Sequence, residues 1–356
     1  YLRYVSRRKG WTEQTKMIRV TIGQTDLYLK QRRRKRVSRK FSPIVPQGKH
    51  PFRYLVEFYF QSNKFLILSG KTQKNNAREL NKVCDTVLKD GRKVGSIRID
   101  NLSVAHLSEA YAIWVRTVRK KGKNDGTRTA NIRSECLSAV YRVAQQAGIV
   151  EKGLSPISLV DKIADKPRRV RWTHQNVKSF LDTAYGEFDY RSIGLIVHMA
   201  YEWAQRLGDM RTLTWDKLDL EAQRCDLTQR KRGAEVHLPI PPQLNKMLVL
   251  QKEDWGFQQY VAPRVKRRAG AYTPYQEEEI HAVVNEVKEI AGLPSELTGQ
   301  DLRRTAITQM VEAGADQFEI MQVSGHTSPN SVTPYLVNTF TGATNALAKR
   351  WSNKDE

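Results

Sequence analysis

The sequence has few cysteines, few acidic residues and no long apolar run. Its 356 residues include three cysteines, Cys84, Cys136 and Cys225. They are odd in number and far apart, which fits neither a disulfide framework nor the spacing of a zinc site. We interpret them as small buried apolar residues in the reducing interior of a cell. No apolar run approaches the ~18 residues of a membrane span, and no signal-peptide pattern opens the chain.

The shortage of acidic residues indicates what kind of molecule the chain binds. Sixty Lys and Arg stand against 37 Asp and Glu, so the formal charge is +23 and the isoelectric point is about 9.9. Such a charge predicts a polyanionic partner, and both nucleic acid and an anionic membrane fit it. Hydrophobic residues make up 40% of the chain, enough for a folded core. The length predicts two or three domains.

The basic charge is concentrated near the N-terminus. Residues 1–53 hold sixteen Lys and Arg against Glu13 and Asp26. Its densest run is predicted to contact DNA phosphates and comprises Arg32, Arg33, Arg34, Lys35 and Arg36. A disordered arm or a nuclear-localisation-like arm remains the alternative for residues 1–52.

Residues 53–93 are predicted to form a small DNA-binding module. Residues 53–60 and 64–68 have the composition of two strands, and residues 73–89 carry apolar positions at helical spacing. A sheet of this kind could dock into a DNA groove.

Residues 97–165 are predicted to be a helical domain with long helices from residue 102 and over 129–147. Between these helices lie cations predicted to clamp the DNA backbone, namely Arg119, Lys120, Lys121, Lys123 and Arg128. The alternative is a solubilising surface. Residues 166–171 are predicted to be a linker, whose Arg168 and Arg169 are further candidates for DNA contact.

Residues 172–356 are predicted to be a further domain. Thr173 can cap a helix, and residues 193–204 are apolar on nearly every face, which is typical of a buried helix. Residues 224–229 and 234–239 predict a hairpin with Lys231 at its turn. The predicted fold class is therefore mainly α with small β-sheets (α+β).

An arginine, a histidine and a tyrosine near the C-terminal end stand at offsets that could gather them around one phosphodiester. They are Arg303, His326 and Tyr335, preceded by Arg206 at the end of the apolar helix and by Lys231. The matching text is AQRLGDMRTLTW, QRKRG, QDLRRT, SGHTS and TPY, in that order. Here the chain resembles the tyrosine recombinase (phage integrase) family, strongly over residues 172–350 and more loosely over 97–165. Residues 53–93 look like its arm-type DNA-binding domain.

The resemblance implies a DNA-cutting enzyme, and the residue types suit that chemistry. Arg206 and Arg303 can each offer paired N–H donors to a phosphate, and His326 would add another. Tyr335 would attack the phosphorus to give a 3′-phosphotyrosyl link. Lys231 would protonate the leaving 5′-oxygen. Because two arginines already balance the phosphate charge, neither a metal ion nor another cofactor is required.

Gln300 departs from the family pattern, which usually has a histidine, and sometimes a lysine, three residues before the second arginine. A glutamine can donate a hydrogen bond to phosphate but cannot titrate. General-base help is worth ~10²–10⁴-fold, so an inactive or slow DNA-binding relative is an alternative. A relaxing enzyme of the type IB topoisomerase kind shares the chemistry and is a third.

The resemblance also implies partners and an assembly. The partner would be double-stranded DNA with core and arm attachment sites of a phage or other mobile element, in the cytoplasm of a bacterial host. The protein would act as a homo-tetramer, with residues 338–351 packing on a neighbouring subunit or capping their own domain. DNA-bending or directionality proteins could assist.

Overall fold

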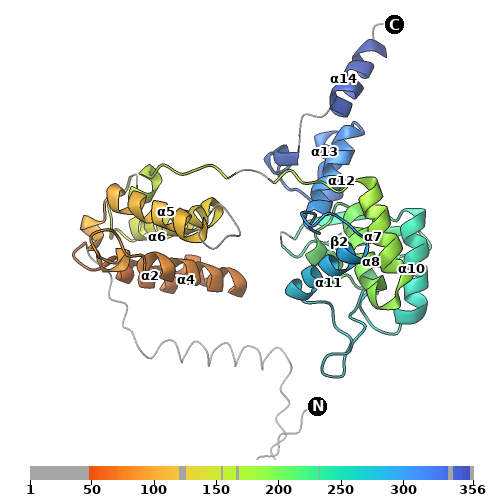
Figure 1. The fold of residues 1–356 in the computed structure, drawn as a ribbon, viewed down its shortest axis with the longest axis horizontal. Coiled ribbons are helices and arrows are strands. Elements are labelled where there is room, and N and C mark those ends of the chain that lie inside the picture. The colour runs from red at the N-terminus through yellow and green to blue at the C-terminus, as the bar shows by residue number, and fades with distance from the viewer. Residues whose placement is uncertain are drawn as a thin grey trace, which may run out of the picture. The chain divides into compact units, whose positions relative to one another are not determined.

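A computed structural model describes residues 48–119, 126–153, 155–165, 168–231, 233–335 and 340–352. Predictions that concern residues 1–47, including the basic run Arg32–Arg36, lie outside the described residues. The chain divides into two compact units, residues 1–167 and residues 168–356. Each is described by itself (Figure 1). Among the described helices, none combines the length and hydropathy that crossing a bilayer requires.

In the described part of unit 1, helices joined by loops and turns are the regular elements. Its α-helices are α2 (Phe52–Gln61), α3 (Asn63–Leu66), α4 (Gly70–Cys84), α5 (Val104–Arg119) and α6 (Thr127–Gln146). Short 3₁₀ turns complete it at η1 (Val94–Ser96), η2 (Ile99–Asn101) and η3 (Pro156–Leu159).

The prediction of two strands over residues 53–60 and 64–68 is wrong, because helices α2 and α3 form there. In α2 the buried positions are Phe52, Leu55, Val56 and Tyr59, which is the i, i+3, i+4, i+7 pattern of one helix face. The aromatic and β-branched composition suggested strands, but the spacing of the apolar residues decided the structure.

Residues 53–93 do not form a core of their own. Side chains of α2 and α4 share one buried cluster with side chains of α5, α6 and η3. Trp114 of α5, which is 1% exposed, donates from its indole Nε1 to Thr86 Oγ1 at 2.8 Å. A further tie is the buried ion pair from Arg133 of α6 to Glu79 of α4, at 3.1 Å. The sequence predicted a module over residues 53–93 and a separate domain from residue 97, but these two segments share one core.

Unit 2 is mainly helical with a small sheet. Its α-helices are α7 (His174–Gly186), α8 (Phe188–Glu202), α9 (Leu207–Met210), α10 (Pro242–Trp255), α11 (Glu277–Ile290), α12 (Asp301–Glu312), α13 (Gln317–Ser324) and α14 (Phe340–Ser352). Its strands are β1 (Leu218–Asp219), β2 (Arg224–Thr228) and β3 (Glu235–Pro239), and its 3₁₀ turns are η4 (Trp215–Lys217), η5 (Pro329–Ser331) and η6 (Thr333–Tyr335).

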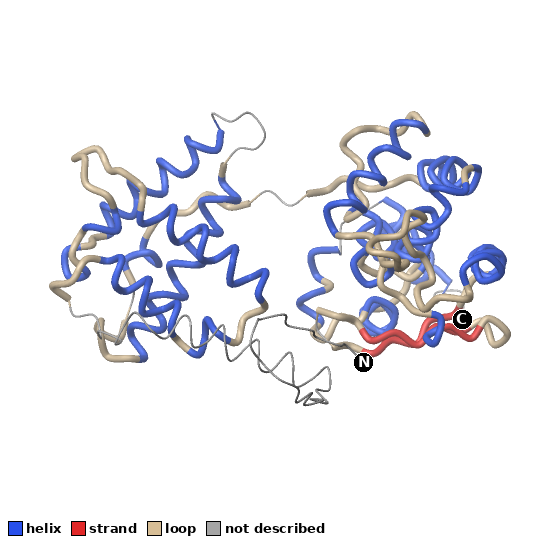
Figure 2. Tube along the Cα trace, turned by 90° about the horizontal axis from the view of Figure 1, so that it is seen from below, coloured by secondary structure: helices blue, strands red, loops and turns tan. Residues whose placement is uncertain are grey.

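The sheet of unit 2 is antiparallel in the order β1-β2-β3 and appears in red in Figure 2. Cys225 pairs with Leu238 and Leu227 pairs with Val236, and all four are buried. The predicted hairpin is confirmed. Because successive side chains of a strand alternate between faces, the next inward position after Leu227 is Gln229.

Helix α8 lies at the centre of unit 2. Residues 192–201 are buried without interruption, as the apolar sequence predicts. Helix α7 packs beside it and is N-capped by Thr173, whose side chain accepts from the Asn176 N–H at 3.1 Å. A separate small cluster under the C-terminal part joins Ala204, α12, α13 and Val332, with Tyr335 packed against it.

The three cysteines are buried free thiols, as predicted. Burial raises the pKa of Cys84 and Cys136 to about 11 and that of Cys225 to about 12, so each is a neutral thiol at physiological pH.

Unit 2 should lose stability below pH 6.5 because of His198. Burial lowers the pKa of His198 from 6.5 to about 4, and its Nδ1 lies 2.9 Å from the Tyr185 hydroxyl. Between these pH values the unfolded chain binds a proton that the folded chain does not. The free energy of unfolding should therefore fall by up to about 1.4 kcal/mol per pH unit as pH decreases.

Urea denaturation at pH 7 and pH 5 measures this loss. The His198→Gln variant should show a smaller decrease than the wild type, whereas His281→Gln in α11 should keep the wild-type decrease. An equal decrease in all three proteins would exclude His198 as its source.

Candidate active site

Arg303 is the centre of the candidate site. It lies in the first turn of α12 and is 7% exposed. Its Nη1 donates to the Ala204 carbonyl at 2.9 Å, and its Nη2 lies 3.1 Å from His326 Nε2. Ala204 has a left-handed backbone, with φ of 49°, which directs this carbonyl at the end of α8. The guanidinium is thus fixed between two segments far apart in the sequence.

The contacts of His326 define its tautomer. Arg303 has only donors, so His326 Nε2 must accept and carries no proton in this arrangement. The proton then lies on Nδ1, which is 2.8 Å from the hydroxyl oxygen of Ser324, a buried residue. Because a hydroxyl can donate as well as accept, Ser324 can support either tautomer. His326 can therefore turn Nε2 into a donor when Arg303 binds another acceptor.

Tyr335 completes this cluster from the last 3₁₀ turn before α14. Its ring centroid is 5.6 Å from that of His326, and Tyr335 is close enough to Arg303 to raise the pKa of that guanidinium. The neighbouring Arg304 lies over the Tyr335 ring at 5.1 Å and donates to the Pro334 carbonyl at 3.2 Å. Arg304, in the first turn of α12, thus contacts both Pro334 and Tyr335.

Arg206 stands at the start of α9 with 28% of its side chain exposed. Its Nη1 donates to Gln229 Oε1 at 2.9 Å and is 3.7 Å from Asp209 Oδ2. Asp209 is 5% exposed, and its other oxygen accepts from the Arg230 N–H at 3.2 Å. The carboxylate therefore joins α9 to the hairpin turn.

The guanidinium group of Arg303 lies close to a second one, that of Arg206. Burial is the largest cause that lowers its pKa, repulsion by Arg206 lowers it further, and Tyr335 and Asp209 oppose both, with a net value of about 10. Arg303 thus stays charged at neutral pH, close to a second guanidinium. An anion bound by both arginines would relieve this repulsion.

Two further sequence candidates lie at the edge of this cluster. Lys231 is exposed at the turn between β2 and β3, two residues after Gln229. Gln300 is exposed at the N-cap of α12, where its side chain makes no capping bond. The structure brings Arg206, Arg303, His326 and Tyr335 together, and it places Lys231 and Gln300 on the flanking segments, where neither forms a hydrogen bond or ion pair with these four residues.

The cations predicted to bind DNA are only partly described. Lys120, Lys121 and Lys123 lie outside the described residues, as does the side chain of Arg119. Arg128 is exposed and pairs with Asp165 at 2.8 Å. Arg169 is exposed.

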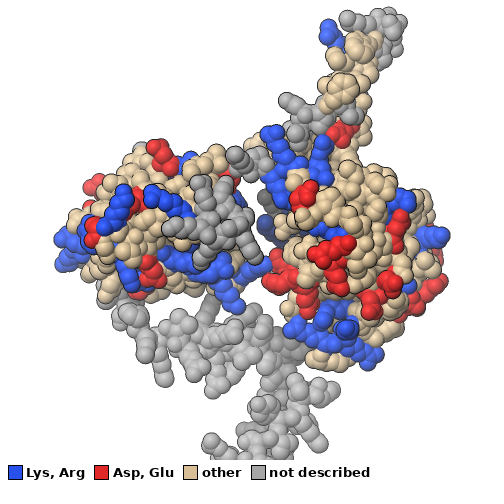
Figure 3. All heavy atoms as spheres, viewed as in Figure 1, with Lys and Arg blue, Asp and Glu red and all other residues tan. Residues whose placement is uncertain are grey.

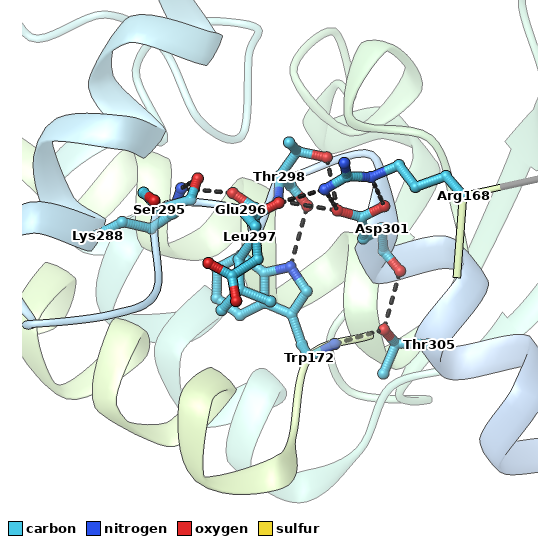
Figure 4. Close-up of polar contacts among 9 residues, drawn as sticks. All are labelled: Arg168, Trp172, Lys288, Ser295, Glu296, Leu297, Thr298, Asp301 and Thr305. Carbon is cyan, nitrogen blue, oxygen red and sulfur yellow. Dashed lines mark hydrogen bonds and ion pairs between the residues drawn. The ribbon is translucent and has the colours of Figure 1, made fainter. Parts of the chain in front are cut away.

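Arg168 contacts the helix that carries Arg303 (Figure 4). Its guanidinium donates to both oxygens of Asp301, at 2.7 and 2.8 Å, and to the Glu296 carbonyl. Asp301 is buried, and its Oδ2 also accepts from Thr298 N–H and Oγ1. Burial alone would raise the pKa of Asp301, but these bonds lower it below its ordinary value. Arg168 therefore stabilises the first turn of α12.

Replacing Arg168 by methionine is expected to lower the free energy of unfolding of unit 2 by about 1–2 kcal/mol, because the buried Asp301 loses two charged donors. The low end of that range allows for solvent around Arg168, whose side chain is 47% exposed. Since the folded-state pKa of Asp301 is lowered, the difference from wild type should be full at neutral pH. It should disappear as pH falls below the folded pKa.

The control is Lys178→Met, which removes an exposed pair with Asp182 and should cost no more than ~0.5 kcal/mol. Urea denaturation at several pH values compares the variants. Equal losses from the two substitutions would contradict the role of Arg168.

The sequence interpretation missed several polar residues that support the site. Gln205 and Gln229 are 1% and 0% exposed, and Ser324 is 0% exposed. A signal for Gln229 was present, because it continues the alternation of Cys225 and Leu227 onto the buried face. For Ser324 no local pattern indicates that it would orient His326.

No group of three or more His, Cys, Asp or Glu that could hold a metal ion occurs among the residues that the structure describes.

An additional exposed basic turn is formed by Lys266, Arg267 and Arg268. It is closed by the pairing of Arg268 with Ala271. Arg267 lies over the Tyr272 ring at 4.7 Å, which ties this turn to the aromatic side chain beside it.

Residues 170–341 match the sequence model of the phage integrase family. The chain is 24% identical over 220 residues to the shufflon-specific DNA recombinase of Escherichia coli, a match that covers 61% of this chain and 52% of that protein. The chain thus spans about half the length of this curated relative.

Solved structures show the same fold. The Tn1549 transposon integrase in complex with transposon right-end DNA has a TM-score of 0.65 at 15% identity, over 84% of this chain and 99% of that chain. A lambda integrase dimer bound to a core site has a TM-score of 0.64 at 15% identity, over 87% and 85%. A lambda integrase tetramer bound to a Holliday junction has a TM-score of 0.63 at 14% identity, over 92% of each chain.

Proposed function

We propose that this chain, whose residues 170–341 belong to the phage integrase family, is a site-specific DNA recombinase that cuts and rejoins DNA through Tyr335. The observation that carries the proposal is the cluster of Arg303, His326 and Tyr335, in which His326 Nε2 is 3.1 Å from the Arg303 guanidinium and the His326 and Tyr335 ring centroids are 5.6 Å apart. These three side chains come from separate segments, and together they offer a nucleophile beside donors for a phosphate.

In this mechanism Arg206 and Arg303 bind the non-bridging oxygens of one phosphodiester. Attack adds negative charge to these oxygens, and preorganised guanidinium donors stabilise that charge more in the transition state than in the ground state. His326 adds a third donor once Nε2 carries the proton, with Ser324 supporting the change of tautomer. The like-charge repulsion at Arg303 is relieved as the phosphate binds.

The Tyr335 oxygen then forms a bond to phosphorus while the bond from phosphorus to the 5′-oxygen breaks. The product is a 3′-phosphotyrosyl link and a free 5′-hydroxyl. Lys231, at the exposed hairpin turn, donates the proton that the leaving oxygen requires. The tyrosine proton passes to water, because the side chain of Gln300 cannot take it up. A second 5′-hydroxyl can reverse the step, so no ATP is consumed.

The test is to trap the covalent intermediate. A duplex nicked close to the cleavage point loses its 5′-hydroxyl fragment, so religation fails and an adduct resistant to detergent accumulates. Peptide mapping should place the DNA on Tyr335, and EDTA should not change the yield, since guanidinium groups supply the charge stabilisation. An adduct on another residue, or DNA binding with no adduct on the protein's own attachment DNA, would contradict the proposal.

A non-catalytic DNA-binding function is the second candidate, and Gln300 favours it. If the protein is a slow enzyme limited by this residue, Gln300→His should raise the single-turnover cleavage rate by about tenfold or more. The gain should appear as pH rises through ~6.5, where an unperturbed histidine loses its proton. A variant as inactive as the wild type across this pH range would favour the non-catalytic function.

We also propose double-stranded DNA and further copies of the chain as partners. Lys and Arg side chains appear on both units in Figure 3, and Arg169 and the basic turn Lys266–Arg268 add exposed cations to the predicted ones. Helix α14 exposes Phe340, Leu347 and Trp351, which are 89%, 41% and 55% exposed. These apolar side chains support packing of α14 on a neighbouring subunit in a tetramer.

The integration or excision of a mobile element and the use of accessory proteins remain part of this proposal. So does an arm-binding role for residues 53–93, which would present helices to DNA rather than a sheet.

A further inference from the structure

Gln229 makes a complete set of hydrogen bonds at the base of the candidate site. It follows β2 and is 0% exposed. Its Oε1 accepts from Arg206 Nη1 at 2.9 Å, and its Nε2 donates to Gln205 Oε1 at 2.6 Å and to the Ser324 carbonyl at 2.7 Å. Every polar atom of this buried amide therefore has a partner.

Gln205 extends the set to a second amide. It is 1% exposed, and its Nε2 donates to the Trp203 carbonyl at 2.8 Å and to the Val323 carbonyl at 2.7 Å. Together the two amides bind the end of α8, the last turn of α13 and the end of β2. We call Gln205 and Gln229 the amide pair.

The polarity of the amide pair allows one orientation of Gln229. Arginine has only donors, so the atom of Gln229 that faces Arg206 must be the carbonyl oxygen. The amide nitrogen then faces two oxygen acceptors, as observed. A flipped amide would set N–H groups against a guanidinium and an oxygen against two oxygens. The orientation of Arg206 is thus coupled to that of Gln229.

Gly325 brings the backbone before His326 against the same amide. A Cβ on Gly325 would lie 2.5 Å from Gln229 Nε2, and the glycine has φ of 66°. Any larger residue would therefore displace the Gln229 side chain. The close approach of Gly325 to Gln229 therefore fixes the position of the backbone that leads into His326.

These contacts tie together segments that carry three site residues. Gln229 touches Arg206 directly, precedes Lys231 by two residues, and binds the carbonyl of Ser324, two residues before His326. We propose that Gln229 is a positioning residue, which holds the Arg206 guanidinium in register with the His326 segment and the Lys231 turn. This inference rests on the proposed function, and it predicts an effect on the cleavage rate rather than on DNA affinity.

The chain offers a matched control in Gln251 of α10. It is also 0% exposed, its Oε1 accepts from Arg191 Nε at 2.9 Å, and its Nε2 donates to Ser192 Oγ and the Val261 carbonyl, both at 3.1 Å. Its partners include none of the site residues. Gln229→Met and Gln251→Met thus remove the same kinds of bonds from equally buried places.

Both variants should lose similar thermal stability, because each leaves buried partners unpaired. Gln229→Met should lower the single-turnover rate of adduct formation by about 10- to 100-fold, the scale of one hydrogen bond to a charged group. Its dissociation constant for DNA should stay within about twofold of wild type. Gln251→Met should keep the wild-type rate. Equal rate losses in both variants would overturn the inference.

A double-mutant cycle with Arg206→Ala separates positioning from general damage. If Gln229 acts through Arg206, Gln229→Met should cause little further loss in that background. Losses that multiply would overturn the inference. If Gln229→Met does not fold, the near-isosteric pair Gln229→Glu and Gln251→Glu serves the same comparison, because Gln229→Glu replaces the amide donor to Gln205 and Ser324 by a carboxylate oxygen that cannot donate.

Stabilisation by inorganic phosphate provides a readout that needs no cleavage. Phosphate should raise the melting temperature of wild type and of Gln251→Met more than that of Gln229→Met. A wild type that forms no adduct but shows this difference would contradict the proposed function and support the role of Gln229. If the wild type forms the adduct but phosphate raises the melting temperature of all three proteins equally, the proposed function is supported and the role of Gln229 is contradicted.

Discussion

The Tyr335→Phe variant is expected to bind DNA as the wild type does and to form no detectable covalent adduct. The substitution removes the attacking oxygen, but the ring can keep its place 5.6 Å from His326 and beneath Arg304. Loss of a nucleophile that forms a covalent intermediate typically costs about 10⁶-fold, which is below detection in a gel assay.

Two measurements check this result together. Adduct formation on nicked duplexes reports the chemistry, and gel retardation on the uncut duplex reports binding. Tyr190→Phe is a suitable control, because it removes an exposed hydroxyl that donates to Glu286 at 2.7 Å in the same unit. Adduct formation by Tyr335→Phe would mean that another residue is the nucleophile. Loss of adduct by both variants would mean that the assay reports stability.

Arg303→Lys is expected to lower the cleavage rate by about 10²–10³-fold, the cost of removing one preorganised donor to a developing oxyanion. A single ammonium cannot bind the Ala204 carbonyl, His326 Nε2 and a phosphate as the planar guanidinium can. Because residue 303 is only 7% exposed, water cannot easily supply the hydrogen-bond donors that a lysine lacks. The rate should fall although the charge is conserved.

The control for this prediction is Arg171→Lys, which changes an exposed arginine that pairs with Glu312 at 2.9 Å. Single-turnover cleavage at saturating protein should leave this control within about twofold of wild type. An Arg303→Lys enzyme as fast as the control would show that charge alone suffices at this position. The bidentate geometry would then have no part in the mechanism.

Most of unit 2 could be predicted from the sequence because its signals are local. Thr173 caps its helix, residues 193–204 are apolar on all faces, and the hairpin alternates over 224–239. Residues 53–68 show where this approach fails. Their aromatic and β-branched residues favour strands, but the four buried positions of α2 face a core supplied by α4, α5 and α6. The helical spacing of these positions, which lets them pack against distant helices, outweighed local propensity.

In the candidate site, too, some features follow from the local sequence and others only from the fold. The order of five short motifs is a linear property, and with the charge of +23 it was enough to predict the family, the DNA partner and the residue types of the chemistry. The family is confirmed for residues 170–341. That Arg303, His326 and Tyr335 lie in one cluster, however, is a property of the folded chain alone.

By itself, then, the sequence determined the class of protein and which side chains could do chemistry, because spacing and residue type are written along the chain. The tertiary structure alone decided what orients those side chains. Gln229 reaches Ser324 across 95 residues and Arg168 reaches Asp301 across 133. Such bonds form between groups whose burial and direction are set by the packing of whole helices, so no local pattern encodes them.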